Sequence, residues 1–343
     1  MICKNTIARK IYLLTFALFL FAPFSLLSAQ TITVEPKVIN PPVRGVRPIS
    51  RIVLDENITA ERSIAVDDRV KVQLSVCEGK VKVNGWERNE IRAFVTGGRQ
   101  IRFKIIQRGG ENETPVWLEV VGFDPTKNNG TGAIECLSGK EIEIDVPRGA
   151  TVNVKSNQSE TTIDSVRKVT VKNAGGNIFL NRIAEGISAE TYQGGVTVEN
   201  SSGAMTLNTS TGNIVAFGVN SSEIGDVFRA KTSSGTILLQ RIEHRQTEVT
   251  SASGSIKFVG NFQNGGQYTL RTHNGSILLA LSEKSSFRLN ASFGFGAFNS
   301  EIPLENVIKN VSPKAQSLTA TVGKGESTLT TNTVSGAIRI KKQ

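Results

Sequence analysis

The stretch "TSSGTILLQRI" at 232–242 reads as a turn followed by a short strand, and the same pattern recurs along the chain. Related copies are "TSTGNIVAFGV" at 209–219, "SASGSIKFVGN" at 251–261 and "THNGSILLALS" at 272–282. The turn glycines of the aligned copies are Gly176, Gly194, Gly212, Gly235, Gly254 and Gly275, with Ser159 in a degenerate first copy. The intervals are 17, 18, 18, 23, 19 and 21 residues. A period near 20 is typical of solenoid proteins.

Apolar residues alternate on both sides of each glycine. Ile178 and Leu180 follow Gly176, and Val169 and Val171 precede it. Alternation with a period of two predicts a strand with one buried face. Each copy therefore predicts two short strands bent around a glycine corner, and one such pair cannot bury its inner face alone.

Stacking equivalent pairs at the strand spacing of about 4.8 Å would build a continuous core. We therefore expect an all-β fold, a β-solenoid or single-stranded β-helix-like stack of coils of about 20 residues, preceded by an N-terminal β-strand lobe. The residues expected in one interior column are Ile178, Val196, Ile214, Ile237, Ile256 and Ile277.

A small hydroxyl or amide side chain stands three residues before each corner glycine. These residues are Asn173, Thr191, Thr209, Thr232, Ser251 and Thr272. We expect each group to hydrogen bond to its counterpart in the next coil, because buried polar groups need partners. Glycine at the corner permits a backbone angle or a close approach that a side chain would prevent. Lengthened intervals predict loop insertions near 217–228 and 303–317.

Residues 1–29 have the pattern of a signal peptide. Three basic residues precede an almost wholly apolar run over 11–27, and Ser28-Ala29 supplies small residues before a cut ahead of Gln30. An uncleaved membrane anchor is the alternative. No second apolar run of membrane length follows. We expect an exported protein, either periplasmic or at the cell surface or extracellular.

The remaining chain divides by composition. Residues 30–50 include "EPKVINPPVRGVRP" at 35–48, whose four prolines predict an extended linker. Residues 51–149 contain alternating segments separated by glycine- and asparagine-rich turns, which predict a lobe of β-strands that forms a cap or the first coils. Residues 150–343 are the repeat region.

Without residues 1–29 the chain keeps 37 basic and 30 acidic residues, a net charge of +7. The charge is not concentrated in blocks, so it predicts solubility and weak attraction to anionic polymers, lipopolysaccharide or glycans, and nucleic acid is not an expected partner. Cys77 and Cys136 remain. In an oxidising compartment they form either a disulfide, which would staple one lobe, or two buried thiols.

Three segments resemble the bacterial DUF4097 family, whose members are often labelled adhesins. These are "SVCEGKVKVNGWERNEIRAFV" at 75–95, "EIEIDVPRGATVNVKSNQSETTIDSV" at 141–166 and, after the repeats, "TVSGAIRI" at 333–340. The resemblance runs from about Ile64 onward. It implies a β-solenoid fold in an exported or envelope-associated protein, and it supplies no catalytic residues.

We predict no catalytic residues, no cofactor-binding residues and no metal ligands. His244 and His273 fall in loop or turn contexts without a cluster of ligands at metal spacing, so we expect solvated or corner histidines. An enzyme alternative rests on Asp164 and Glu199, which occupy the outward position five residues after the corner, two coils apart. Their separation of roughly 10 Å lies near the upper limit for an inverting carboxylate pair.

The rest of that outward column does not resemble a sugar cleft. Another outward column shows no chemical theme when it is read along the repeats, and it consists of Phe179, Thr197, Val215, Leu238, Lys257 and Leu278. The favoured hypothesis is a non-enzymatic, adhesin-like scaffold of the envelope or cell surface that binds a macromolecule, either a glycan or a protein. The alternative is a carbohydrate-active β-helix enzyme, either a polysaccharide lyase or a glycosidase.

Overall fold

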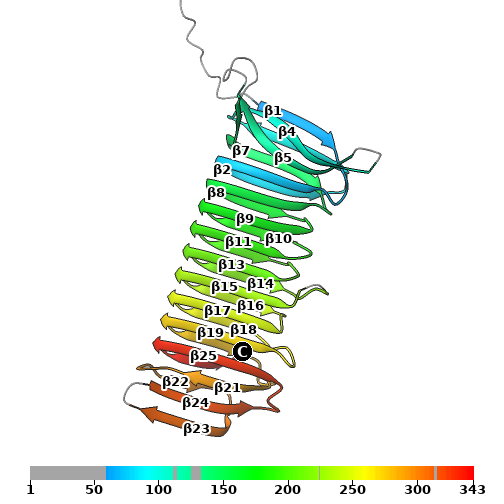
Figure 1. Cartoon of the computed structure of the whole chain (residues 1–343). Coiled ribbons are helices and arrows are strands. Elements are labelled where there is room, and N and C mark those ends of the chain that lie inside the picture. The colour runs from blue at the N-terminus through cyan, green and yellow to red at the C-terminus, as the bar shows by residue number, and fades with distance from the viewer. Residues whose placement is uncertain (1–58, 111–113, 125–132, 224, 313–314) are drawn as a thin grey trace, which may run out of the picture. The chain divides into compact units, whose positions relative to one another are not determined.

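The computed structural model describes residues 59–343, apart from 111–113, 125–132, 224 and 313–314. The signal peptide predicted over 1–29 and the linker predicted over 30–50 lie outside the described residues. Within the described ranges, every element of regular secondary structure is a β-strand, and the strands are numbered β1 to β26 (Figure 1). Within those ranges, no helix has the length and hydropathy needed to cross a membrane.

Each repeat forms one coil of two strands that meet at the glycine corner (Figure 1). The strands before the corner are β9 (Lys168–Gly175), β11 (Ile187–Gln193), β13 (Met205–Thr211), β15 (Val227–Ser234), β17 (Gln246–Ser253) and β19 (Gln267–Asn274). The strands after the corner are β10 (Ile178–Asn181), β12 (Val196–Glu199), β14 (Ile214–Val219), β16 (Ile237–Ile242), β18 (Ile256–Gly260) and β20 (Ile277–Leu281). Each strand pairs in parallel with its counterpart in the next coil. We call the strands before the corner the first sheet and those after it the second sheet.

The interior column predicted from the repeats is confirmed. The strand registers place Ile178 opposite Val196 and continue through Ile214, Ile237, Ile256 and Ile277. All six side chains are fully buried. The repeated β-branched residues therefore stack on one another, which removes their apolar surface from water coil after coil.

The corner glycines are required by the close approach of neighbouring coils. A Cβ atom on Gly194 would overlap the carbonyl oxygen of Gly176, and one on Gly235 would overlap that of Gly212. Any other residue would push two coils apart at this point, because real Cβ atoms do not approach carbonyl oxygens so closely. The corner thus sets the spacing of the whole stack.

The predicted ladder of corner hydroxyls has a different partner from the one expected. Each hydroxyl donates to the carbonyl of the corner glycine in the preceding coil, and the Thr209–Gly194 bond, at 2.8 Å, is representative. The other bonds, Thr191–Gly176, Thr232–Gly212, Ser251–Gly235, Thr272–Gly254 and Thr333–Gly275, measure 2.8 to 3.1 Å. A short hydroxyl cannot span the strand spacing of about 4.8 Å to its counterpart. Only the longer amide of Asn173 does so, and it accepts a hydrogen bond from Ser156 at 2.6 Å.

The stack begins with two long strands that bend through the corner. The strands of this region are β1 (Thr59–Ala65), β2 (Lys71–Trp86), β3 (Glu90–Thr96), β4 (Gln100–Gly109), β5 (Thr114–Asp124), β6 (Ala133–Glu135), β7 (Leu137–Pro147) and β8 (Thr151–Asp164). β2 pairs in parallel with β8, and β8 pairs with both β9 and β10. Strand pairing therefore runs across residue 150, while the domain boundary placed there stays a prediction.

Further strands lie on the edge of β2 that does not pair with β8. β7 pairs in parallel with residues 76–86 of β2, and β3 and β1 follow in antiparallel order. β5 pairs in parallel with residues 71–74 of β2, and β4 pairs antiparallel with β5. These strands cover the edge of the first coil, whose backbone groups would otherwise remain open for pairing.

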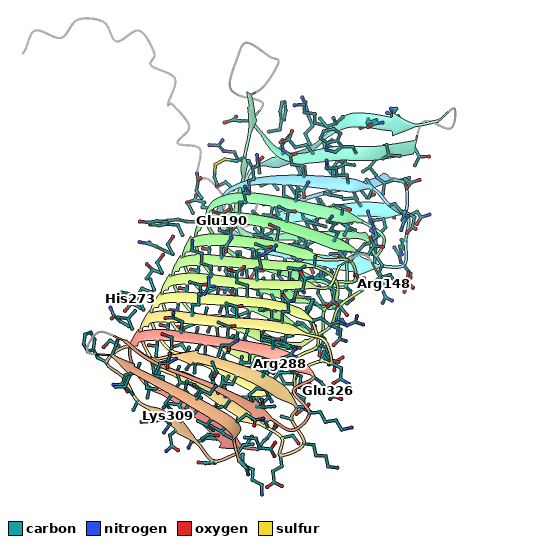
Figure 2. All side chains as sticks on the ribbon, turned by 60° about the horizontal axis from the view of Figure 1, so that its bottom comes forward. Arg148, Glu190, His273, Arg288, Lys309 and Glu326 are labelled. Atoms are coloured by element: carbon teal, nitrogen blue, oxygen red, sulfur yellow. A yellow bond between two sulfur atoms is a disulfide. The ribbon has the colours of Figure 1, made fainter. Side chains whose placement is uncertain are left out.

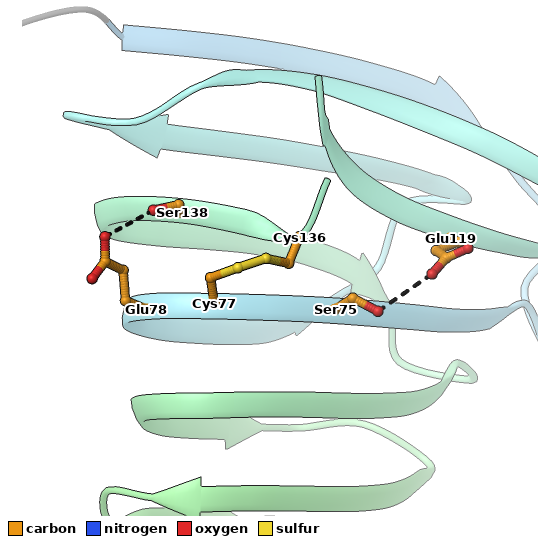
Figure 3. Close-up of a disulfide and its surroundings, with 6 residues drawn as sticks. All are labelled: Ser75, Cys77, Glu78, Glu119, Cys136 and Ser138. Carbon is orange, nitrogen blue, oxygen red and sulfur yellow. Dashed lines mark hydrogen bonds between the residues drawn. A yellow bond between two sulfur atoms is a disulfide. The ribbon is translucent and has the colours of Figure 1, made fainter. Parts of the chain in front are cut away.

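A disulfide joins Cys77 on β2 to Cys136, directly before β7, with the two Cα atoms 5.4 Å apart (Figure 3). Hydrogen bonds lie on either side of it, from Ser138 to Glu78 at 3.1 Å and from Ser75 to Glu119 at 3.3 Å. Because the cysteines are 59 residues apart, the bridge closes a loop that includes β3 to β6. It therefore fastens the antiparallel strands to the first coil.

The last coils do not follow the order of the sequence. The strands are β21 (Phe287–Ser292), β22 (Phe298–Ser300), β23 (Glu305–Ser312), β24 (Ala315–Val322), β25 (Ser327–Ser335) and β26 (Ile338–Lys342). β25 pairs with both β19 and β21, and β26 pairs with both β20 and β22. The coil at 327–342 is thus inserted between the coil of β19–β20 and the earlier strands β21–β22.

The segment near 303–317, which we expected to be a loop insertion, forms strand β23 and the start of β24 instead. The two strands pair as an antiparallel hairpin, and β24 also pairs with β21. All eight residues of β23 are exposed. A strand with no buried face lacks the apolar alternation on which the prediction depended, which explains why the segment read as a polar insertion.

Replacing Thr232 with Val should lower the free energy of unfolding by about 1–3 kcal/mol, because the partly buried carbonyl of Gly212 loses its donor while the shape of the side chain is kept. Thr250→Val is the matched control, since Thr250 is half-buried on the outer side of β17. Urea unfolding followed by circular dichroism measures both variants. Equal stability of the two variants would contradict the role assigned to the corner hydroxyl.

Removing the disulfide with Cys77→Ser and Cys136→Ser should lower the free energy of unfolding by about 4 kcal/mol, from the entropy of opening a loop of this length. Thiol titration of the unfolded, unreduced protein without residues 1–29 should find no free thiol. Two free thiols would show that the bridge is absent. The wild-type protein treated with reductant is the control and should match the double variant.

Candidate functional site

The two carboxylates of the enzyme alternative lie in one outward column. The registers place Asp164 opposite Asn181 and Asn181 opposite Glu199. Asp164 forms an ion pair with Arg182 and accepts a hydrogen bond from the Ser165 hydroxyl at 3.0 Å. Glu199 is exposed. Asp164 is therefore held by structural contacts, and the two carboxylates have different surroundings.

A hollow of about 470 Å³ lies beside this column, lined by Arg148, Ser165, Val166, Arg182 and Ala184. Both of its guanidinium groups have carboxylate partners, since Arg148 pairs with Glu87 at 2.6 Å and Arg182 pairs with Asp164. Neither Asp164 nor Glu199 lines the hollow. Its charges are thus already balanced by the protein itself.

His244 differs from the solvated or corner histidine that we expected. It lies in the connection between β16 and β17, but its side chain is fully buried. Its Nε2 atom lies 2.8 Å from the carbonyl oxygen of Gly203, and its ring lies 5.7 Å from that of Phe228. The Tyr268 hydroxyl donates to the backbone carbonyl of His244 at 3.0 Å. The sequence could not indicate this burial, because the residue follows a strand end and is not part of an alternating pattern.

Burial lowers the pKa of His244 below its ordinary value of 6.5. The hydrogen bond to Gly203 and the charges of Asp226 and Glu243 act in the opposite direction but are smaller effects. The neutral ring with Nε2 protonated can donate to Gly203, which leaves Nδ1 as an acceptor. Nδ1 has no hydrogen-bond partner among the described residues. His244 is therefore a structural residue of the interior.

His273 is exposed on β19 and projects from the first sheet, as Glu190 does (Figure 2). Among the residues that the structure describes, no group of three or more His, Cys, Asp or Glu side chains could hold a metal ion.

Two outward columns of the first sheet are polar in its later coils. Registers from β13 to β25 give two adjacent columns, and these contain Thr206, Arg229, Glu248, Thr269 and Thr330, and Asn208, Lys231, Thr250, Arg271 and Asn332. None of the ten side chains is apolar. Arg229 and Glu248 form an ion pair across neighbouring strands at 3.7 Å.

The outward side of the second sheet is different in the same coils. The registers from β14 to β26 give the columns Val215, Leu238, Lys257, Leu278 and Arg339, and Phe217, Gln240, Val259, Ala280 and Lys341. Six of these side chains are apolar, three are basic and one is an amide. The guanidinium of Arg241 lies 4.1 Å from the centre of the Phe217 ring.

This combination of apolar and basic residues corrects the sequence-based prediction that the outward positions share no common chemistry. Read alone, the first column mixes apolar and charged residues over its whole length. The theme emerges only when the neighbouring column is added and when Arg339 and Lys341 are placed after Leu278 and Ala280. Applying the register of Gly336 to the outward positions that follow it would have found these two residues.

Comparison with known proteins adds a family and two solved structures. The profile of the family described as Toastrack DUF4097 matches residues 56–341. A search of the curated proteins finds no match. The chain is similar to a Clostridium sporogenes protein described as a "putative cell adhesion protein", with 14% identity over 83% of this chain and 100% of that chain and a TM-score of 0.21. It is also similar to a Parabacteroides distasonis protein described as a "Putative lipid binding protein", with 11% identity over 82% of this chain and 97% of that chain and a TM-score of 0.43.

The lowered pKa of His244 predicts a pH dependence of stability. The unfolded chain binds a proton below about pH 6.5, whereas the folded chain binds it only at a lower pH because the pKa of His244 is lowered. The stability that the neutral ring provides is therefore present above about pH 6.5 and is lost as the pH falls. The wild-type protein should lose up to about 1.4 kcal/mol per pH unit more than His244→Gln on going from about pH 6.5 to pH 5.

Urea unfolding over this range measures the difference between the two proteins. His273→Gln is the control and should follow the wild type, because that side chain is exposed. A His244→Gln curve parallel to the wild type would show that the buried ring does not contribute to acid sensitivity.

Proposed function

The chain belongs to the Toastrack DUF4097 family, and from this membership we propose that it is a non-enzymatic scaffold of the cell envelope or cell surface. One side of its β-solenoid binds a macromolecule. The observation that carries the proposal is that inward, corner and outward positions of each coil have different roles. Inward positions build the core, corner positions join the coils, and the outward positions form two extended surfaces of different chemistry.

Several of the groups that could perform chemistry are engaged in the structure. The corner hydroxyls donate to glycine carbonyls, Asp164 pairs with Arg182, and His244 is buried against Gly203. A general base needs access to a substrate proton, which a fully buried ring does not have. These contacts favour a binding role over turnover.

Export is part of this proposal. It is supported by the signal-like pattern over 1–29 and by the Cys77–Cys136 disulfide, since such bridges persist mainly in oxidising compartments. The periplasm and the cell surface are both oxidising, and the net charge of +7 without residues 1–29 favours an anionic partner in either place.

The purified protein should bind envelope material without altering it, and Asp164→Asn and Glu199→Gln should change that binding by less than about twofold. Both carboxylates lie in coils before Phe217, outside the part of their column that is apolar and basic. Co-sedimentation with an isolated envelope fraction measures the binding. Incubation with bacterial and plant polysaccharides, followed by assays for reducing ends and unsaturated products, measures turnover. Turnover that either substitution abolishes would replace the scaffold with a polysaccharide lyase or glycosidase.

A further inference from the structure

The five neighbouring strands β14, β16, β18, β20 and β26 are fully described and contain no Asp or Glu. They carry five basic residues, namely Arg241, Lys257, Arg339, Lys341 and Lys342. The carboxylate of Glu283, which follows β20, pairs with Lys342. The other four basic side chains are exposed on this part of the second sheet, which we call the basic apolar face.

Aliphatic and aromatic groups lie between these charges. Val215, Leu238, Leu278, Phe217 and Val259 are all partly exposed, although each projects away from the core. Their columns are adjacent, so the groups lie close together on four neighbouring strands that span about 14 Å. The basic residues of β26 extend the face by one more strand. Partly exposed apolar groups that gather on one face in this way favour contact with a partner.

The first sheet of the same coils provides an internal comparison. It carries three basic residues and one acidic residue in its two columns but no apolar side chain. Net positive charge is thus common to both pairs of columns, whereas within these columns only those of the second sheet combine charge with apolar groups. A partner attracted by charge only would not need this combination.

We propose that the basic apolar face docks onto a membrane surface that contains anionic lipid. Lys257, Arg339 and Lys341 contact the headgroups, while Leu238 and Leu278 enter the boundary between headgroups and acyl chains. Each basic residue near such a surface contributes to binding, and apolar side chains at the boundary add to it. A polysaccharide would instead need hydrogen-bonding groups, which the first sheet presents. This inference rests on the proposed scaffold function and names its partner.

The test uses the purified protein and two kinds of vesicle, one of phosphatidylcholine alone and one of equal parts phosphatidylcholine and phosphatidylglycerol. Binding to the anionic vesicles should be stronger and should weaken as salt is raised. Lys257→Glu with Arg339→Glu should reduce it by at least about tenfold, because attraction at two positions becomes repulsion.

The matched control is Lys231→Glu with Arg271→Glu, which changes the net charge equally on the first sheet and should reduce binding by less than about threefold. A second readout places tryptophan on either side. Leu238→Trp should show a blue shift of fluorescence with anionic vesicles, and Thr250→Trp should not.

Equal losses in the two charge-reversal variants would overturn the proposal, because they would show attraction by net charge alone. No binding to either vesicle would also overturn it. Binding to an anionic polysaccharide or an acidic protein that depends on Lys257 and Arg339, without vesicle binding, would assign this face to that other partner. If Lys257→Glu with Arg339→Glu keeps full binding to envelope material, the membrane inference fails while the scaffold function stands.

Discussion

The close contact of successive coils at the glycine corner is the constraint on which the rest of the structure depends. A glycine lies against the carbonyl of the glycine before it, and a buried hydroxyl in the same coil satisfies that carbonyl. The contact fixes the distance between coils at the strand spacing, so that parallel hydrogen bonds form along both sheets. Once the spacing is fixed, equivalent residues of successive coils line up in columns. Inward residues form the columns of the core, and outward residues form the columns of the surface.

The repeat of about 20 residues was enough to predict the coils, because it shows which residues occupy equivalent positions in successive coils. It could not predict the partner of Thr209, since the Gly194 carbonyl comes within reach of that hydroxyl only when the coils stack. It also could not place β25 between β19 and β21, because order in the sequence does not determine order in the stack. The basic apolar face was missed for the same reason, because its last members, Arg339 and Lys341, come from the inserted coil and lie beside β20 only in the folded stack. His244 was misjudged because burial of an isolated loop residue leaves no periodic signal.

The repeated architecture explains how one chain can carry two different surfaces. Inward substitutions disturb neighbouring coils, because each interior residue packs between its counterparts, whereas outward residues contact only their neighbours on the same sheet. The first sheet can therefore be polar and the second apolar and basic without any conflict in the core between them. At the beginning of the stack, strands β5 and β7 cover the edge of β2, and the Cys77–Cys136 bridge fastens this region. A scaffold of this design can change its binding chemistry while its core is unchanged.

The insertion of the coil at 327–342 has a consequence for how the molecule assembles. As the chain is synthesised, each coil through β20 can settle on the one made just before it, which keeps loop closure short. Strand β21 has no such template, because its neighbour β25 is made only after the hairpin β23–β24. It can pair at once with β24, so an antiparallel module forms beside the unfinished stack. Residues 327–342 then enter between the two preformed parts and join them. Assembly therefore ends when residues 327–342 join the stack to the antiparallel strands. A chain that stops before these residues would have two separate folded parts instead of a slightly shorter solenoid.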